Sequence, residues 1–172
     1  MTKILIISDT HQNDILLRDV LSYNNDCQNI IHLGDEPDDL IYNADLIEDK
    51  TIHFVYGLYH PKWNKNNACI SFTIDNISFT IAHAKEILPI KTLKTQHSTH
   101  NTSIFCFGHT HNRYYKKENN SIYINPGHLK KEHDRGDIAG YVVITVSENI
   151  SIVFYDYKHN ALKDYEHIVI KV

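Results

Sequence analysis

The feature that most constrains the fold is the order of apolar runs in the first third of the chain. Three short apolar runs are typical of strands covered on both faces: 3–8, 29–33 and 51–56. Asn13 is a suitable N-cap for a helix over residues 14–23, and a shorter helix is expected near residues 37–46. This alternation of strands and helices predicts a parallel sheet with right-handed crossovers.

Further along the chain, strand-like segments come in pairs that are joined by short polar turns. Hairpins are expected over 68–74 with 77–82, 113–117 with 121–125, and 141–146 with 150–155. Other segments are expected to form a buried strand (104–107), an edge strand (167–172), and a weak helix or irregular segment (87–100). We therefore predict an α/β fold of two packed sheets with helices outside. No repeat or linker interrupts residues 1–172, which are expected to form one domain.

Composition narrows the classes of function. A net charge of -4 without a basic stripe argues against a protein that binds the nucleic-acid backbone. No apolar run approaches the roughly 18 residues that a membrane-spanning helix needs. The first apolar run meets Asp9 too early for a signal peptide. Three widely spaced cysteines make no disulfide framework and indicate free thiols. A cytoplasmic protein with no membrane partner is expected.

Carboxylate and imidazole side chains follow five successive predicted strands. They stand in five short motifs, Ser8-Asp9-Thr10-His11, Gly34-Asp35, Gly57-Leu58-Tyr59-His60, His83 and Gly108-His109-Thr110-His111. Ligands of open α/β sheets bind at the carboxyl ends of the strands. Mixed oxygen and nitrogen donors without cysteine favour Mn, Fe or Zn over Ca or Mg. Seven donors suit two ions that share a carboxylate, which indicates metal-assisted phosphoester hydrolysis and leaves amide hydrolysis open.

These motifs, together with Asn125-Pro126-Gly127, resemble the calcineurin-like metallophosphoesterases, and most of all their small YfcE-type phosphodiesterase branch. The resemblance runs from residue 9 to 127, and residues 141–155 resemble the hairpin that ends this branch. It implies an αββα sandwich of two mixed sheets flanked by helices. It also implies hydrolysis of phosphodiesters or phosphomonoesters by a hydroxide that two metals activate.

The resemblance also implies which residues hold the two divalent metals, often Mn, with Fe, Zn or Ni as alternatives. The implied ligands are Asp9, His11 and His111 for the first metal, Asp35 as the bridge, and His83 with His109 for the second. His109 or His83 is expected to neutralise charge on the phosphoryl oxygens, so His109 is also a candidate catalytic residue.

The third motif departs from the family pattern Gly-Asn-x-Asp, whose Asn ligates the second metal. Here Leu58 replaces that Asn, Tyr59 replaces a histidine common in relatives, and His60 replaces the Asp. Two interpretations stay open. The second site has weakened metal binding, or His60 substitutes for the lost ligand or acts as the general acid, since an imidazole pKa near about 6.5 suits that role.

Two functions of different classes follow. The first is an active phosphodiesterase whose partner is a small phosphoester or a nucleotide. The second is a catalytically weakened or inactive binding or scaffold protein on the same fold, like the retromer subunit that resembles this family, and Leu58 favours it. Survival of six of the seven expected ligands favours catalysis. The apolar hairpins allow a homodimer without requiring one.

Several residues outside the motifs carry competing interpretations. His128 follows Asn125-Pro126-Gly127 where relatives carry Ser, and it either is solvated or meets a substrate phosphate. His32 is expected to be a hydrogen-bonded core imidazole. Lys130, Lys131 and Arg135 either form an ordinary solvated charge run or attract an anionic substrate.

Overall fold

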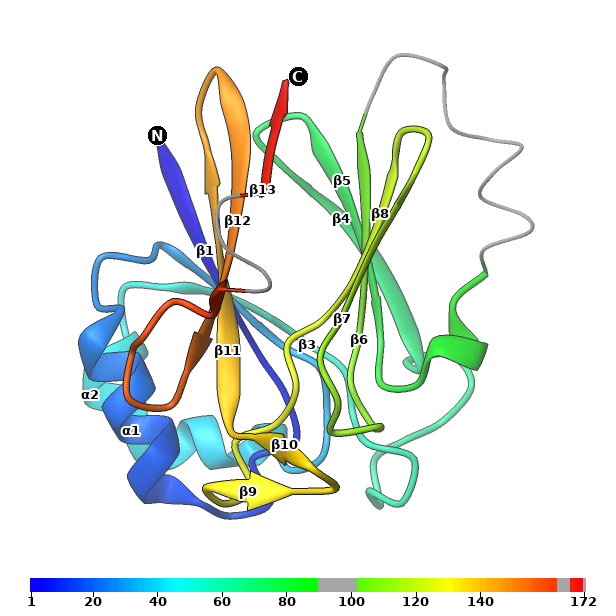
Figure 1. The fold of residues 1–172 in the computed structure, drawn as a ribbon. Coiled ribbons are helices and arrows are strands. Elements are labelled where there is room, and N and C mark those ends of the chain that lie inside the picture. The colour runs from blue at the N-terminus through cyan, green and yellow to red at the C-terminus, as the bar shows by residue number, and fades with distance from the viewer. Residues whose placement is uncertain (90–101, 164–167, 172) are drawn as a thin grey trace.

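The computed structural model describes residues 1–89, 102–163 and 168–171. Two mixed β-sheets stand face to face, and α1 and α2 lie on the outer side of the first sheet (Figure 1). This confirms the predicted α/β sandwich of two mixed sheets. Most of the segment expected to be a weak helix or irregular, 87–100, lies outside the described residues.

The first sheet has six strands in the order β13-β12-β11-β1-β2-β3. Its strands are β1 (Thr2–Ile7), β2 (Asn29–His32), β3 (Thr51–Phe54), β11 (Gly140–Val146), β12 (Asn149–Asp156) and β13 (Ile168–Lys171). As predicted, β1, β2 and β3 pair in parallel, and β13 is an edge strand. The other three strands pair antiparallel, which makes the sheet mixed.

The second sheet has five strands in the order β4-β5-β6-β8-β7. Its strands are β4 (Cys69–Ile74), β5 (Ile77–Ala82), β6 (Ser103–Phe107), β7 (Tyr114–Glu118) and β8 (Ser121–Asn125). The predicted hairpins β4–β5 and β7–β8 are confirmed. The turn between β7 and β8 is one residue shorter than expected, because Glu118 pairs with Ser121 and only Asn119 and Asn120 remain in the turn.

The apolar run of β1 is continuous because both of its faces are covered. Ile4 and Ile6 pack into the core between the sheets, together with side chains of β5, β6 and β8. Leu5 and Ile7 point the other way and pack against α1. Burial stabilises a fold by about 25 cal/mol for each Å² of apolar surface, and these two layers contain most of the buried apolar side chains of the described residues.

The helices lie over the first sheet. They are α1 (Asp14–Tyr23), the 3-10 helix η1 (Pro37–Asn43) and α2 (Ala44–Ile47). The Oδ1 atom of Asn13 accepts a hydrogen bond from the Leu16 amide, so Asn13 is the N-cap of α1 as predicted. A further 3-10 helix, η2 (Lys85–Ile87), follows β5. In the part of the chain that the structure describes, no helix is long and apolar enough to span a membrane.

The carboxyl ends of four strands are joined in pairs at one end of the sandwich. The Asp9 amide after β1 donates to the Gly34 carbonyl after β2, at 3.0 Å, and the Gly108 amide after β6 donates to the His83 carbonyl after β5, at 2.8 Å. The small hairpin of β9 (His133–Asp134) and β10 (Asp137–Ile138) lies at the same end (Figure 1). The motifs that follow the strands therefore meet there.

Candidate metal centre

Two groups of metal-binding side chains form where the strand ends meet. In each group the potential ligand atoms lie within 4.8 Å of one another. The first group is Asp9, His11, Asp35 and His111, and the second is Asp35, His83 and His109. The structure thus brings together all six side chains that the sequence singled out as metal ligands. It also divides them into the same two sets.

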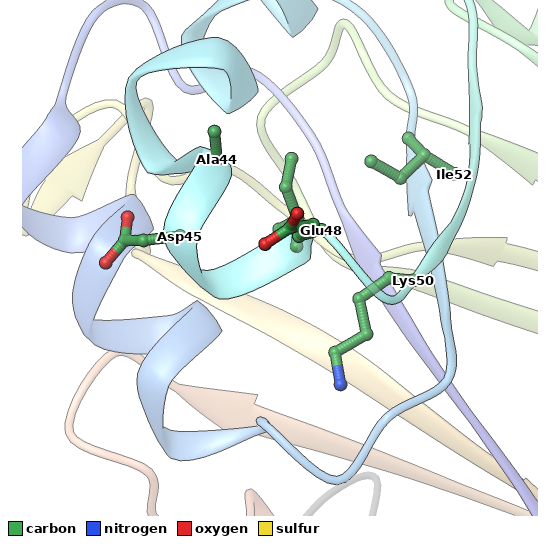
Figure 2. A pocket seen from close by; sticks show the side chains of 6 residues that line it. Ala44, Asp45, Glu48, Lys50 and Ile52 are labelled. Carbon is green, nitrogen blue, oxygen red and sulfur yellow. The ribbon is translucent and has the colours of Figure 1, made fainter.

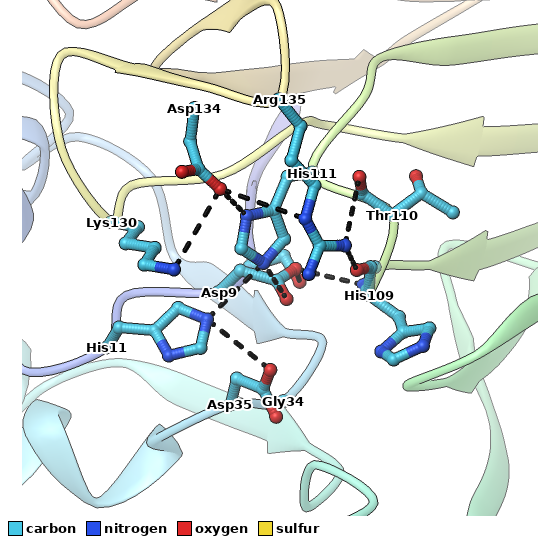
Figure 3. Close-up of polar contacts among 12 residues, drawn as sticks. Asp9, His11, Gly34, Asp35, His109, Thr110, His111, Lys130, Asp134 and Arg135 are labelled. Atoms are coloured by element: carbon cyan, nitrogen blue, oxygen red, sulfur yellow. Dashed lines mark hydrogen bonds and ion pairs between the residues drawn. The ribbon is translucent and has the colours of Figure 1, made fainter.

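Asp35 belongs to both groups and turns one carboxylate oxygen toward each. Its Oδ2 atom lies 3.4 Å from Nε2 of His11, and its Oδ1 atom lies 3.3 Å from Nε2 of His83. Figure 3 shows His11 between this carboxylate and His111. A carboxylate placed in this way can bridge two ions.

The first group is compact and mostly buried. Nε2 of His111 lies 3.2 Å from Oδ1 of Asp9 and 3.3 Å from Nε2 of His11. The side chains of Asp9 and His111 are almost completely buried, whereas His11 and Asp35 remain partly open to solvent. A ligand can therefore approach from the side of His11 and Asp35.

Two buried polar atoms of the site have no hydrogen-bond partner in the described structure: Oδ1 of Asp9 and Nε2 of His83. Burying such an atom unpaired costs about 1–3 kcal/mol. Both atoms are lone-pair donors that face the two groups, and a divalent cation would satisfy both. The donor set of carboxylate oxygen and imidazole nitrogen, without thiolate, fits such a cation.

Each buried ligand is oriented from behind by a second hydrogen bond. Nδ1 of His83 lies 2.8 Å from the Leu33 carbonyl, and Nδ1 of His111 lies 2.5 Å from Oδ2 of Asp134. Oδ2 of Asp9 accepts from the His109 amide at 3.0 Å and from the Ser8 hydroxyl. Such contacts fix the ring orientation and leave the other ring nitrogen for a metal.

The backbone is strained where the ligands stand. Five of the six adopt left-handed φ values: Asp9 at 53°, His11 at 47°, Asp35 at 51°, His109 at 69° and His111 at 63°. Residues other than glycine rarely occupy this region, and such strain clusters at functional sites. The fold therefore holds these side chains in place at a conformational cost.

Three glycines make room for the ligand side chains. A Cβ atom on Gly57 would lie 1.8 Å from Oδ1 of Asp35, and one on Gly108 would lie 2.0 Å from the Ser8 hydroxyl. A Cβ atom on Gly34 would lie 2.5 Å from Nδ1 of His83. These glycines are needed because the ligands approach the backbone closely.

Burial and charge act against each other on the titratable groups of the site. Burial raises the pKa of the Asp9 carboxyl, but the close contact with His111 and the His83 charge outweigh it and hold this pKa below its ordinary value. Burial lowers the pKa of His111, and the contact with Asp9 together with the hydrogen bond to Asp134 more than reverses this, so its pKa is raised. Burial lowers the pKa of His11 despite the nearby Asp35.

The loop after β3 places His60 outside both groups. Nδ1 of His60 accepts from the Lys62 amide at 3.2 Å, and Nε2 lies 3.6 Å from Oδ2 of Asp38. The ring stacks on Tyr56 with 4.5 Å between centroids. The neighbouring Tyr59 is 90% exposed. Neither residue completes the second group, which has three donors among the described residues.

His128 is buried, which corrects the interpretation of this residue as a solvated loop histidine. Its ring lies 5.4 Å from that of His111, and its Nε2 atom lies 3.4 Å from the Asp137 carbonyl. Sequence reasoning also missed Ser8 and Asp134, which orient Asp9 and His111. The adjacent pair Arg135-Gly136, typical of a two-residue hairpin turn, was a signal for the hairpin that carries Asp134.

A shallow hollow elsewhere on the molecule is unrelated to this centre. It lies beside α2 and is lined by Ala44, Asp45, Ile47, Glu48, Lys50 and Ile52 (Figure 2). None of the six candidate ligands is among its lining residues.

The fold and the two ligand groups define a phosphoesterase-like protein, and the family assignment agrees. The model of the calcineurin-like phosphoesterase superfamily domain matches residues 2–149, so this chain belongs to that superfamily. No curated protein matches the chain in sequence.

Solved structures of the same fold cover the whole chain. A predicted phosphoesterase from Streptococcus pneumoniae has a TM-score of 0.72 at 15% identity, covering 99% of this chain and 98% of its own. The phosphoesterase YfcE from E. coli has a TM-score of 0.64 at 16% identity, with coverages of 99% and 100%. Vps29 from Entamoeba histolytica, complexed with Zn²⁺, has a TM-score of 0.64 at 19% identity, with coverages of 99% and 98%.

Proposed function

We propose that this chain is a metal-dependent phosphodiesterase that hydrolyses a small phosphodiester or a nucleotide, with two divalent ions, Mn in the first instance. The observation that carries the proposal is the placement of Asp35, whose two oxygens face His11 and His83 at 3.4 and 3.3 Å. Oδ1 of Asp9 and Nε2 of His83 support it, because neither has a hydrogen-bond partner among the described residues and a cation would satisfy both.

The chain's own residues would divide the work as follows. Asp9, His11 and His111 would hold the first ion, His83 and His109 the second, and Asp35 would bridge them. When bound, the two ions supply activation of water and neutralisation of charge on the phosphoryl group. His109 is half-buried rather than buried, so its imidazole is the part of the second group that a phosphoryl oxygen can approach.

His60 keeps the proposed role of general acid through Nε2. Nδ1 accepts from the Lys62 amide, so the neutral ring carries its proton on Nε2, on the side of Asp38. To act as a general acid the ring must carry a proton on Nδ1 as well, which would replace the contact with the Lys62 amide. A leaving group that receives this proton must therefore reach the loop after β3. An unchanged activity and metal content in His60→Ala would leave this residue without a role in the site.

The second candidate function is a scaffold on the same fold, and Leu58 favours it. The side chain of Leu58 has no donor atom. Among the described residues the second group has three donors, which is fewer than the number of ligands around a tetrahedral or octahedral ion. The likeness to the Vps29 structure named above shows the fold alone. An ion held by the first group would then serve stability, since a ligand that binds only the folded state stabilises it.

Metal analysis paired with hydrolysis of bis(4-nitrophenyl) phosphate, with and without manganese, separates the two functions. We expect about two ions per chain and manganese-dependent turnover. Asp35→Asn removes the shared charge and is expected to lower turnover at least about 100-fold and to release metal. The control is Asp45→Asn, an exposed carboxylate on α2 that pairs with Arg18.

One ion or none, with no turnover under manganese, would contradict the phosphodiesterase proposal and favour the scaffold.

A further inference from the structure

Three cations surround one carboxylate beside the first ligand group. Nζ of Lys131 lies 3.0 Å from Oδ1 of Asp134, while Nζ of Lys130 and Nε of Arg135 each lie 3.9 Å from its Oδ2. The same Oδ2 holds His111. Figure 3 shows Lys130 and Arg135 on either side of Asp134, next to His111.

The three cationic side chains are exposed to solvent, whereas the Asp134 carboxylate that they surround is mostly buried. The side chains of Lys130, Lys131 and Arg135 are 37%, 59% and 54% exposed, against 10% for Asp134. Asp134 is shared with His111, and together with the exposed Glu132 it leaves the segment 130–135 with three cations against two carboxylates. This segment therefore carries one net positive charge beside the metal centre, although the chain as a whole has a net charge of -4.

Arg135 is anchored on the ligand-bearing loop itself. Its Nη1 atom donates to the His109 carbonyl at 3.0 Å and lies 3.5 Å from the Thr110 carbonyl. Among the described residues, its Nη2 atom has no hydrogen-bond acceptor, so part of the guanidinium is available to a ligand. An arginine held in this way is preorganised to donate from its remaining N–H groups to the oxygens of a phosphate.

Lys130 stands on the other side, toward His11. Figure 3 shows its side chain beside Asp134 and above His11, and its Nζ atom lies 3.9 Å from the Oδ2 atom of Asp134 that holds His111. The side-chain Nδ2 atom of Asn13, the N-cap residue of α1, donates to the Lys130 carbonyl at 2.9 Å and ties this part of the loop to the helix. The backbone of Lys130 and the guanidinium of Arg135 are thus held at the margin of the centre.

We propose that Lys130 and Arg135 form a second anion subsite, and that the substrate carries a phosphate group in addition to the phosphodiester that is cleaved. This inference rests on the proposed function and specifies its substrate class. A nucleotide with a further phosphate on its sugar has the required chemistry. The patch has only three cations on an acidic chain, which suits a small substrate better than a nucleic-acid strand.

The test uses two esters that differ only in this second phosphate. They are the 4-nitrophenyl ester of thymidine 5′-phosphate and the same ester with a 3′-phosphate, both given to the manganese-loaded protein. We expect the 3′-phosphorylated ester to have a kcat/KM about tenfold higher, and we expect added salt to reduce this ratio. Lys130→Gln and Arg135→Gln are each expected to bring the ratio close to one.

The matched control is Lys116→Gln, which removes an exposed lysine of β7 that pairs with Glu118. It is expected to keep the wild-type ratio. Metal content is measured for every variant, so that a loss through His109 or His111 is distinguished from a loss of anion binding. A ratio near one in the wild type, or an unchanged ratio in both variants, would overturn the subsite.

A second measurement keeps the subsite testable if neither ester is hydrolysed, an outcome that would contradict the proposed function alone. Calorimetric titration with thymidine 3′,5′-bisphosphate and with thymidine 5′-phosphate should then show tighter binding of the bisphosphate. Lys130→Gln and Arg135→Gln should remove the difference. Equal binding of the two nucleotides, or tighter binding of a single-stranded DNA oligomer than of the bisphosphate, would contradict the subsite.

Discussion

Gly57 and Leu58 are neighbours in the loop after β3, and they affect the second ligand group in opposite ways. Gly57 lets Asp35 approach, because any Cβ atom there would overlap Oδ1 of Asp35. Leu58 brings no donor to a group that has Asp35, His83 and His109. Gly57 therefore leaves room for the bridging carboxylate of Asp35, while Leu58 adds no ligand for the second ion.

At this position Leu58→Asn is expected to strengthen the second site. The amide oxygen adds a hard donor beside three existing ones, and manganese affinity for the second ion should rise about tenfold. Isothermal titration of the metal-free protein measures it, and Leu58→Ala is the control for loss of the leucine side chain. Equal affinities for the second ion in all three proteins would show that this position does not reach the ion.

The hairpin of β9 and β10 is the element that links the loops around the centre. Arg113 is 5% exposed, and its guanidinium is bound to the Asp137 carboxylate and to the Ile138 carbonyl. The Arg113 amide also donates to Asp137, at 2.9 Å. This anchor holds Asp134, two residues before the turn ends, against Nδ1 of His111.

Asp134→Asn tests whether the hairpin orients the ligand. The variant keeps the shape but removes the charge that favours a proton on Nδ1 of His111, so manganese affinity of the first site is expected to fall about 10–100-fold. Metal titration measures the loss, and Asp49→Asn, an exposed carboxylate paired with Lys50, is the control. An unchanged affinity would mean that the ring is held by other contacts.

The sequence predicts an element well when residues close in the chain determine it, and poorly when contacts with distant residues determine it. The apolar runs and polar turns of β1 to β8 are local patterns, and the sheets follow them closely. The strands β9 and β10 have two residues each and no apolar periodicity, so their position depends on the distant Arg113. The hairpin that carries Asp134 was therefore missed.

The same distinction separates the candidate ligands from the other histidines. The candidate ligands meet because the carboxyl ends of parallel strands lie at the same edge of a sheet. The order of strands and motifs along the chain is enough to predict this. The direction of His60 is set by contacts with Tyr56 and Asp38, and the burial of His128 by packing near His111. Contacts of that kind do not follow from the neighbouring residues in the chain.

On the scale of the whole molecule, the stability of the fold depends on pH through a histidine that titrates inside the first sheet. His32 is completely buried, its Nδ1 atom accepts from the Gly34 amide at 3.2 Å, and its Nε2 atom lies 3.4 Å from the Thr10 hydroxyl. This core position was predicted. Burial lowers the pKa of His32 to about 4. The ring is therefore neutral in the folded protein at pH 7.

Because the unfolded chain takes up a proton near pH 6.5, about where a free imidazole titrates, and the folded one does not until about pH 4, stability is lost as the pH falls between these values. His32 alone should lower the free energy of unfolding by about 2 kcal/mol from pH 7 to pH 5. Urea unfolding of the metal-free protein at both pH values measures it. His32→Gln should lose less stability over the same interval, and an equal loss in both proteins would contradict the assignment.

The six candidate ligands come from both sheets. Asp9, His11 and Asp35 follow strands of the first sheet, and the three histidines His83, His109 and His111 follow strands of the second. An ion held by either group would therefore link the two sheets, which are otherwise joined by apolar packing and by a few hydrogen bonds such as that between Nδ1 of His83 and the Leu33 carbonyl. The affinity for the metal ion then depends on how the two sheets are aligned. A substitution in the core between the sheets, such as Phe79→Leu, should therefore lower the affinity for the metal ion, although Phe79 is distant in the chain from most of the ligands.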